Sequence, residues 1–229
     1  MQRENNATSA ERNAAEGMGV FRMGDALVSD YLGERRISLG DSSFHMVASR
    51  SIFVDKSLLI KDILDSHSKV ILFCRPRRFG KSLALSMFQC FFEVPNDKLT
   101  NKLVSNNLPL FQKLAIWDVD EGAYRKRFAS SPVINLRLAS TKSLRWEVTR
   151  EAIAQIIAEE YGRHSYLEDS PVLNTMEKAY FRRVWGRQGS ETDVSFSLKN
   201  LVVFLERHHG VPPILLIDEY DAPILAGYT

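Results

Sequence analysis

Residues 69–82 read KVILFCRPRRFGKS and join a continuous apolar run to a Gly-Lys-Ser step. The run Val70–Cys74 has a β-branched start and no polar residue, which is the pattern of a strand buried on both faces. After the step, apolar residues recur at helical spacing from about Lys81 to Phe92 and cover most of the helix circumference. A buried strand, a basic loop and a deeply packed helix in this order predict a phosphate-binding P-loop.

The residues of this loop suit the phosphates of a nucleotide. Gly80 lets the backbone approach closely, Lys81 can bring positive charge to the β- and γ-phosphates, and Ser82 can offer its hydroxyl to Mg²⁺. The N–H groups at the start of the helix also favour an anion. The residues predicted to surround the nucleotide are Arg75, Arg77, Arg78, Phe79, Gly80, Lys81, Ser82 and Leu83.

The start of the loop departs from the general P-loop pattern. That pattern has a glycine five positions before Gly80, where this chain has Arg75 followed by Pro76. On the pattern alone, a basic turn that caps a helix is therefore an alternative. The three arginines could stabilise a triphosphate, contact nucleic-acid phosphates or be solvated. Without a wider basic face, nucleic acid is the lesser option.

A second motif follows near the end of the chain, where residues 214–219 read ILLIDE. A buried apolar strand is predicted here, and it ends in two acids at its carboxyl end, where ligands bind in open α/β sheets. Asp218 can orient Mg²⁺ through water, and Glu219 is suited to polarise an attacking water as a general base. An ordinary strand end with solvated acids is the alternative, but the pairing with Gly-Lys-Ser argues against it.

The remaining elements fit the same architecture. Pro132–Leu138 is a further strand candidate, and helices are expected at about 143–161 and 197–206, the latter ending near Gly210. Residues 96–130 resemble short helices and loops, and 162–192 are less regular. Strands that alternate with helices predict an α/β fold of the P-loop NTPase type, with a three-layer α/β/α parallel sheet. Residues 1–43 are expected to form a flexible arm before this domain.

Composition excludes several classes of protein. The formal net charge of +2 is too small to argue for nucleic acid or a membrane surface. Cys74 and Cys90 show no zinc-site spacing, and the pattern favours two reduced cysteines over a disulfide between them. No apolar run reaches transmembrane length, and the N-terminus lacks the apolar core of a signal peptide. An intracellular, cytoplasmic location is the resulting expectation.

With these motifs placed, the chain resembles the AAA-ATPase-like family of P-loop proteins over about residues 44–229. The Arg-Pro-Arg-Arg start of the loop is itself typical of that family. The matching segments are Phe53–Ser57, Arg75–Leu83, Leu85–Met87, Phe91–Glu93 and Leu216–Ile224. The resemblance implies ATP and Mg²⁺ as cofactors, with Lys81, Ser82, Asp218 and Glu219 in the roles given above. Many family members also carry a PD-(D/E)XK nuclease-like domain, to which nothing in this chain corresponds.

The sequence ends eleven residues after Asp218. A P-loop ATPase of this kind has two more strands after the acids, so we expect a C-terminally incomplete domain, with Mg-dependent ATP hydrolysis in the full-length protein. The alternatives are a non-catalytic nucleotide-binding or protein-interaction module and, less favoured, a nucleic-acid-associated ATPase. The expected partner is a nucleotide, and a homo-oligomer or a protein partner is left open.

Overall fold

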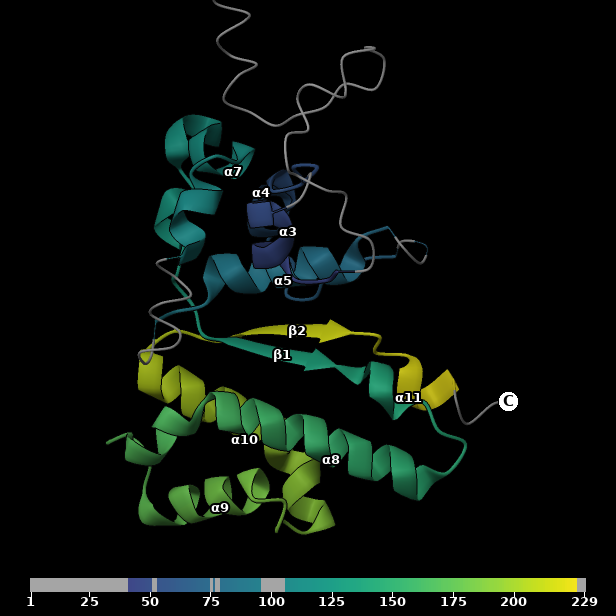
Figure 1. The fold of residues 1–229 in the computed structure, drawn as a ribbon. Helices are drawn as coiled ribbons and strands as arrows, with labels where there is room; N and C mark the ends of the chain where they lie inside the picture. The colour runs from purple at the N-terminus through teal and green to yellow at the C-terminus, as the bar shows by residue number, and fades with distance from the viewer. Residues whose placement is uncertain (1–40, 51–52, 75, 77–78, 96–105, 226–229) are drawn as a thin grey trace, which may run out of the picture. The chain divides into compact units, whose positions relative to one another are not determined.

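A computed structural model describes residues 41–50, 53–74, 76, 79–95 and 106–225 (Figure 1). The chain divides into two compact units. The first comprises Met1–Cys90 with Ser105–Lys126, and the second comprises Phe91–Val104 with Arg127–Thr229. Residues 1–40 lie outside the described residues, so the flexible arm stays a prediction.

The first unit is helical in its described residues. The segment 106–111 is one of its helices. The others are α3 (Phe44–Arg50), α4 (Leu58–Asp65), α5 (Lys81–Phe92, whose last two residues belong to the second unit), α7 (Ala115–Asp118) and the short 3-10 helices η1 (Val119–Gly122) and η2 (Arg125–Arg127, which ends in the second unit).

Aromatic and aliphatic side chains form the core of this unit. The rings of Phe44 and Phe111 stack with centroids 4.9 Å apart, and the rings of Phe73 and Phe88 lie 5.7 Å apart. The predicted helix over Lys81–Phe92 is confirmed as α5. Its apolar side chains pack deeply as expected, since Met87, Phe88, Phe91 and Phe92 are all buried.

The strand predicted before the loop is absent, so this prediction is wrong. Val70–Cys74 has no regular secondary structure, and the side chains of Val70 and Leu72 are 87% and 60% exposed. A strand needs a neighbour to pair its N–H and C=O groups. Among the described residues, the only sheet has two strands, β1 and β2, which pair with each other. An apolar run shows that a segment prefers burial, but it does not supply the partner strand.

The second unit contains that sheet. Strands β1 (Val133–Arg137) and β2 (Ile214–Asp218) run parallel, in a register that pairs Val133 with Ile214 and Arg137 with Asp218. Both strands were predicted and are confirmed as strands. The burial predicted for the second is wrong in part, because Leu215 and Ile217 of β2 are 40% and 37% exposed and the helices cover one face of the sheet. The other elements of the unit are η3 (Leu138–Thr141), α8 (Trp146–Arg163), η4 (Ser165–Asp169), α9 (Thr175–Trp185), α10 (Glu191–His209) and α11 (Ala222–Leu225).

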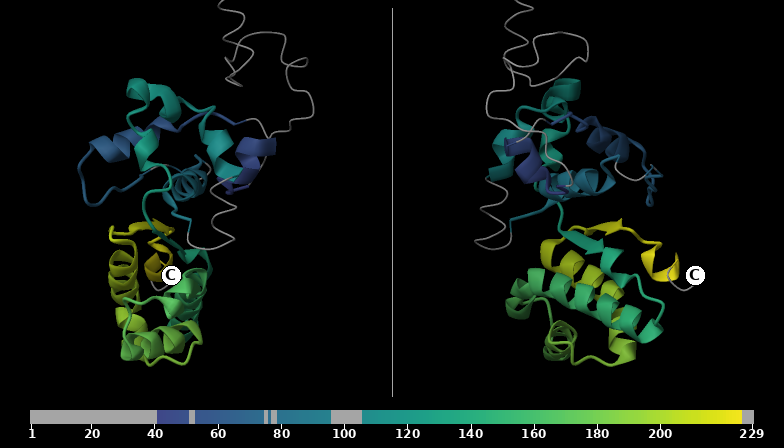
Figure 2. Two further views of the ribbon diagram at one scale, coloured as in Figure 1. Left: turned by 90° about the vertical axis from the view of Figure 1, so that its left-hand side faces the viewer. Right: turned by 45° about the vertical axis from the view of Figure 1, so that its right-hand side comes forward.

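Helices cover one face of this sheet. Figures 1 and 2 show α8 and α10 lying along the two strands, with α9 packed beneath these helices. The rings of Tyr161 and Phe181 meet with centroids 4.8 Å apart in the core between the helices. The same core contains Ile134, Leu136, Leu167, Leu173, Val184, Leu201, Phe204 and Leu205. The second unit is therefore an α/β arrangement with parallel strands, while the full three-layer P-loop sheet stays a prediction.

The helix predictions of this unit are confirmed in part. The helix expected at 143–161 is α8, and the helix expected at 197–206 is α10, which begins earlier, at Glu191. Gly210 follows α10 with φ +71°, a left-handed conformation that glycine adopts without strain, and ends the helix as expected. The prediction that 162–192 are less regular is wrong, because the segment contains α9.

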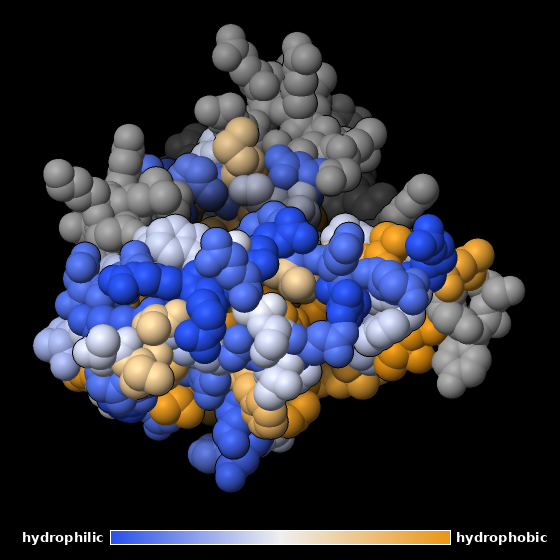
Figure 3. All heavy atoms as spheres, turned by 90° about the horizontal axis from the view of Figure 1, so that it is seen from below, coloured by the Kyte–Doolittle hydropathy of each residue, from blue (hydrophilic) through white to orange (hydrophobic). Residues whose placement is uncertain are grey.

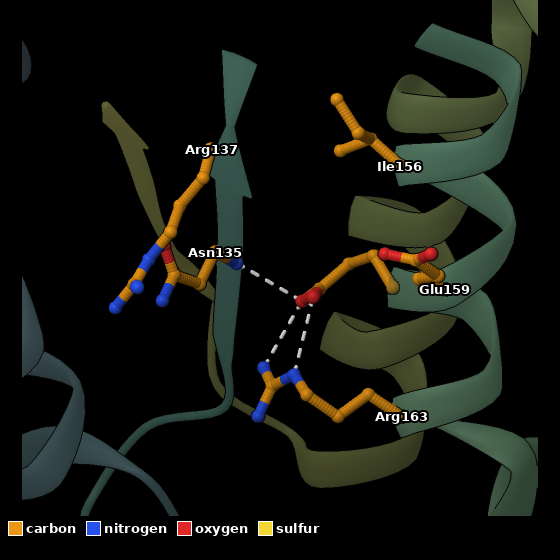
Figure 4. Close-up of a pocket in the computed structure, with 6 residues that line it drawn as sticks. Asn135, Arg137, Ile156, Glu159 and Arg163 are labelled. Carbon is orange, nitrogen blue, oxygen red and sulfur yellow. Dashed lines mark hydrogen bonds and ion pairs between the residues drawn. The ribbon is translucent and has the colours of Figure 1, made fainter. Parts of the chain in front are cut away.

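The outer edge of β1 is closed by side chains of α8. The Glu160 carboxylate accepts a hydrogen bond from the Asn135 N–H at 3.0 Å (Figure 4). The Arg163 guanidinium donates to the Val133 carbonyl. These groups take the place of a neighbouring strand for the backbone of β1. The edge is therefore not open for a further strand at these two residues.

The same side chains form a buried ionic network. Arg163 donates to Glu93 at 2.7 Å and to Glu160 at 3.0 Å. Burial alone would raise the pKa of Glu160, but a hydrogen bond from His164 and the charge of Arg163 hold this pKa below its ordinary value. A cavity of about 240 Å³ lies next to the network, lined by Asn135, Arg137, Ile156, Glu159, Glu160 and Arg163. Its lining contains none of the predicted site residues.

The helical side of the second unit is mostly hydrophilic. Seen from below, polar and charged side chains dominate this face, and apolar ones are scattered among them (Figure 3). Exposed apolar side chains on its helices include Met176 and Phe196. Scattered residues of this kind are normal on a protein surface and indicate no docking site by themselves.

Candidate functional site

The predicted phosphate loop leads directly into α5. Gly80 has φ +76°, and its carbonyl accepts the first helical hydrogen bond from the Ala84 N–H at 2.9 Å. A Cβ at Gly80 would meet only the Lys56 ammonium, at 3.9 Å, which is a normal van der Waals contact distance. The backbone angle, rather than crowding, is therefore the physical reason for glycine at this position. Lys81 and Ser82 begin the helix, where N–H groups have no partner within the helix and favour an anion.

The side chains around Gly80 enclose a small hollow. It has a volume of about 10 Å³, which is room for about one water, and is lined by Lys56, Leu59, Phe73, Phe79, Gly80, Lys81 and Ala84. The Lys81 ammonium donates to the Pro76 carbonyl at 3.1 Å. The ammonium has three N–H donors, so it can also donate to a phosphate at this helix end.

The other predicted loop residues are placed only in part. Phe79 is 59% exposed, and Leu83 lies in the first turn of α5 after Ser82. Arg75, Arg77 and Arg78 lie outside the described residues, so their predicted contacts with a nucleotide stay predictions.

The two predicted acids lie together at the carboxyl end of β2. Asp218 is the last residue of the strand, and Glu219 follows in a left-handed backbone conformation with φ +53°. The Glu219 carbonyl accepts a hydrogen bond from the Ala222 N–H at 3.0 Å, which turns the chain into α11. The P-loop residues Gly80, Lys81 and Ser82 belong to the first unit, and the two acids belong to the second.

Lys142 is a neighbour of the acids that the sequence analysis missed. Its ammonium forms an ion pair with the Glu219 carboxylate. Lys142 follows η3, which continues directly from β1, and the in-register parallel pairing brings the carboxyl ends of β1 and β2 to the same edge of the sheet. A lysine shortly after a neighbouring strand is a weak sequence signal, because such residues are usually solvated.

Neither a ready-made metal cluster nor a membrane span is found in the described part of the chain. No group of three or more His, Cys, Asp or Glu side chains could hold a metal ion there. Magnesium that is bound through one carboxylate, a hydroxyl and substrate phosphates does not need such a group. None of the described helices is both long enough and apolar enough to cross a bilayer.

Comparison with known proteins supplies the family. A family model described as "Predicted AAA-ATPase" matches residues 38–229, which include both the phosphate loop and the two acids after β2. Searches of curated proteins and of solved structures found no match. Because the family model spans most of the sequence, the chain belongs to the AAA-ATPase-like family.

Proposed function

We propose that this chain binds ATP with Mg²⁺ and hydrolyses the bound nucleotide. The observation that carries the proposal is the start of α5: a glycine in a left-handed conformation is followed at once by Lys81 and Ser82 in the first helical turn. This combination of a permissive backbone, a lysine, a hydroxyl and a helix N-terminus suits a polyphosphate. The family match, which describes predicted AAA-ATPases, supports ATP as the nucleotide.

Each residue has a defined role in this proposal. Lys81 binds the β- and γ-phosphates, the Ser82 hydroxyl is a Mg²⁺ ligand, and Asp218 orients Mg²⁺ through water. Arg75, Arg77, Arg78, Phe79 and Leu83 line the nucleotide. Bound Mg²⁺ neutralises charge on the phosphates. Glu219 acts as the general base: its carboxylate accepts the proton of the attacking water.

Phosphate release tests the catalytic part of the proposal. We expect Glu219→Gln to retain ATP binding but to reduce the rate of phosphate release by roughly a hundredfold or more, the usual contribution of a general base. Asp221→Asn is the matched control, because Asp221 is another exposed carboxylate in the same turn. Equal rates of phosphate release by wild type and Glu219→Gln would remove Glu219 from the mechanism.

The Lys142–Glu219 ion pair favours a second candidate function, nucleotide binding without turnover. An ammonium on the carboxylate oxygen competes with a water for the same acceptor. In this case the wild type binds ATP and releases no phosphate, whereas Lys142→Met, which frees the carboxylate, releases phosphate at a measurable rate. Phosphate release by the wild type that depends on Glu219 excludes this candidate.

A further inference from the structure

The segment Phe53–Ser57, which reads FVDKS, is fixed beside the phosphate loop and has no role in the proposed function so far. The Asp55 carboxylate accepts hydrogen bonds from the Ser57 N–H at 2.7 Å and from the Ala115 N–H at 2.8 Å. The Ser57 hydroxyl, which is fully buried, accepts one from the Ile116 N–H at 3.1 Å. Asp55 and Ser57 thus tie the segment to the start of α7 and fix the backbone on both sides of Lys56.

The side chain of Lys56 extends from this fixed backbone towards the loop. Its ammonium lies 3.9 Å from the position that a Cβ of Gly80 would occupy, and Lys56 lines the small hollow together with Gly80 and Lys81. Lys56 forms no ion pair with any residue that the structure describes. By contrast, the ammonium of Lys61 on α4 is bound by Asp65 and Asp120.

Lys56 and Lys81 therefore both line one hollow just before a helix N-terminus. Their positive charges and the positive end of the α5 dipole favour an anion at this place. An anion with several charges, such as a polyphosphate, suits it best.

We propose that Lys56 is a second phosphate-binding lysine, which contacts the polyphosphate of the nucleoside triphosphate bound by Gly80, Lys81 and Ser82. The inference rests on the proposed function, because it assigns Lys56 to the same nucleotide. It also gives the segment Phe53–Ser57 a physical role: Asp55 and Ser57 are positioning residues, and Lys56 is the binding residue.

Calorimetric titration of the full chain with ATP and Mg²⁺ tests the proposal. We expect Lys56→Met to weaken ATP binding roughly ten- to a hundredfold, the usual effect of removing a charged hydrogen bond. Lys56→Arg retains most of the affinity, because it retains the positive charge. Lys113→Met is the matched control, an exposed lysine of the same unit that does not line the hollow, and it leaves the affinity unchanged. The melting temperature of each nucleotide-free variant checks the fold, and Lys56→Gln provides a second charge-removing variant.

The other outcomes separate the inference from the proposed function. Equal ATP affinities of wild type and Lys56→Met, with weaker binding by Lys81→Met, overturn the inference and leave the proposed function standing. Equal losses in Lys56→Met and Lys56→Arg overturn it as well, because the positive charge would then not matter. A wild type that binds no ATP overturns both.

Discussion

Glu219 is the residue on which hydrolysis depends in our proposal, and its backbone conformation is unusual. A φ of +53° is uncommon for a residue with a side chain and costs on the order of 1 kcal/mol. Strained residues of this kind cluster at functional sites. The ion pair with Lys142 is about half exposed, so it contributes little to stability and can be exchanged for other partners.

Three histidines gather around Tyr166 at the ends of α8 and α10. The Tyr166 hydroxyl is hydrogen-bonded to His209 Nε2 at 2.9 Å and to His164 Nδ1 at 3.1 Å, and His208 Nδ1 is hydrogen-bonded to the Ser170 hydroxyl at 2.7 Å. Burial, together with the neighbouring His208 and His164, lowers the pKa of His209 to about 4. Burial also lowers the pKa of His208.

These histidines predict a loss of stability on mild acidification. The unfolded chain takes up a proton at His209 near pH 6.5, whereas the folded chain does so only near pH 4. Between these values the unfolded state binds more protons, so the free energy of unfolding falls as the pH is lowered. From pH 6.5 to 5 we expect a loss of about 1 kcal/mol from His209, allowing for solvent screening of this half-buried group.

Urea denaturation at several pH values measures this effect. The window stops at pH 5 because carboxylates with lowered pKa values, such as Glu177 and Asp193, lose their stabilising charge at more acidic pH. His209→Gln is the control and should flatten the pH dependence. An equally steep dependence in His209→Gln would show that other groups cause it.

At the scale of elements, α9 shows what the sequence analysis overlooked. Apolar periodicity is weak between 162 and 192, so no helix was predicted there. The start of α9 is instead specified by a capping box, in which the Asn174 side chain accepts from the Glu177 N–H at 3.0 Å and Glu177 accepts from the Asn174 N–H at 2.9 Å. An Asn followed three residues later by Glu was the available signal.

The cap makes a quantitative prediction. Asn174→Ala removes the acceptor for the Glu177 N–H and should lower the free energy of unfolding by about 1 kcal/mol. Asn174→Gly, which also loses the acceptor but suits the N-cap backbone, should cost only a few tenths of a kcal/mol. Urea denaturation of both variants provides the measurement. An unfolding midpoint of Asn174→Ala equal to that of wild type would contradict the importance of the cap.

The strands show a different limit of sequence analysis. β2 and the segment Val70–Cys74 are apolar runs apart from the terminal Asp218, and β1 includes the polar Asn135 and Arg137, yet only β1 and β2 are strands among the described residues. β1 and β2 are partners for each other, and α8 and α10 cover them. Local pattern gives the preference of a segment for burial, while strand formation depends on a partner that is distant in the sequence.

At the scale of the whole molecule, the chain divides into two compact units, with the phosphate loop in the first and the two acids in the second. The helix α5, the two strands and the family could be predicted from sequence, because each depends on a local pattern or motif. The division into units could not, because it depends on contacts between distant segments. Lys56 and Lys142 were missed for the same reason, since each lies beside a motif from which it is distant in sequence.

The most direct test of ATP binding at the phosphate loop is a calorimetric titration of wild type and Lys81→Ala with ATP and Mg²⁺. We predict saturable binding by the wild type and at least roughly tenfold weaker binding by Lys81→Ala, because the lysine charge at the β- and γ-phosphates is lost. Equal affinities of the two proteins for ATP, or no binding by the wild type, would contradict a nucleotide site at this loop.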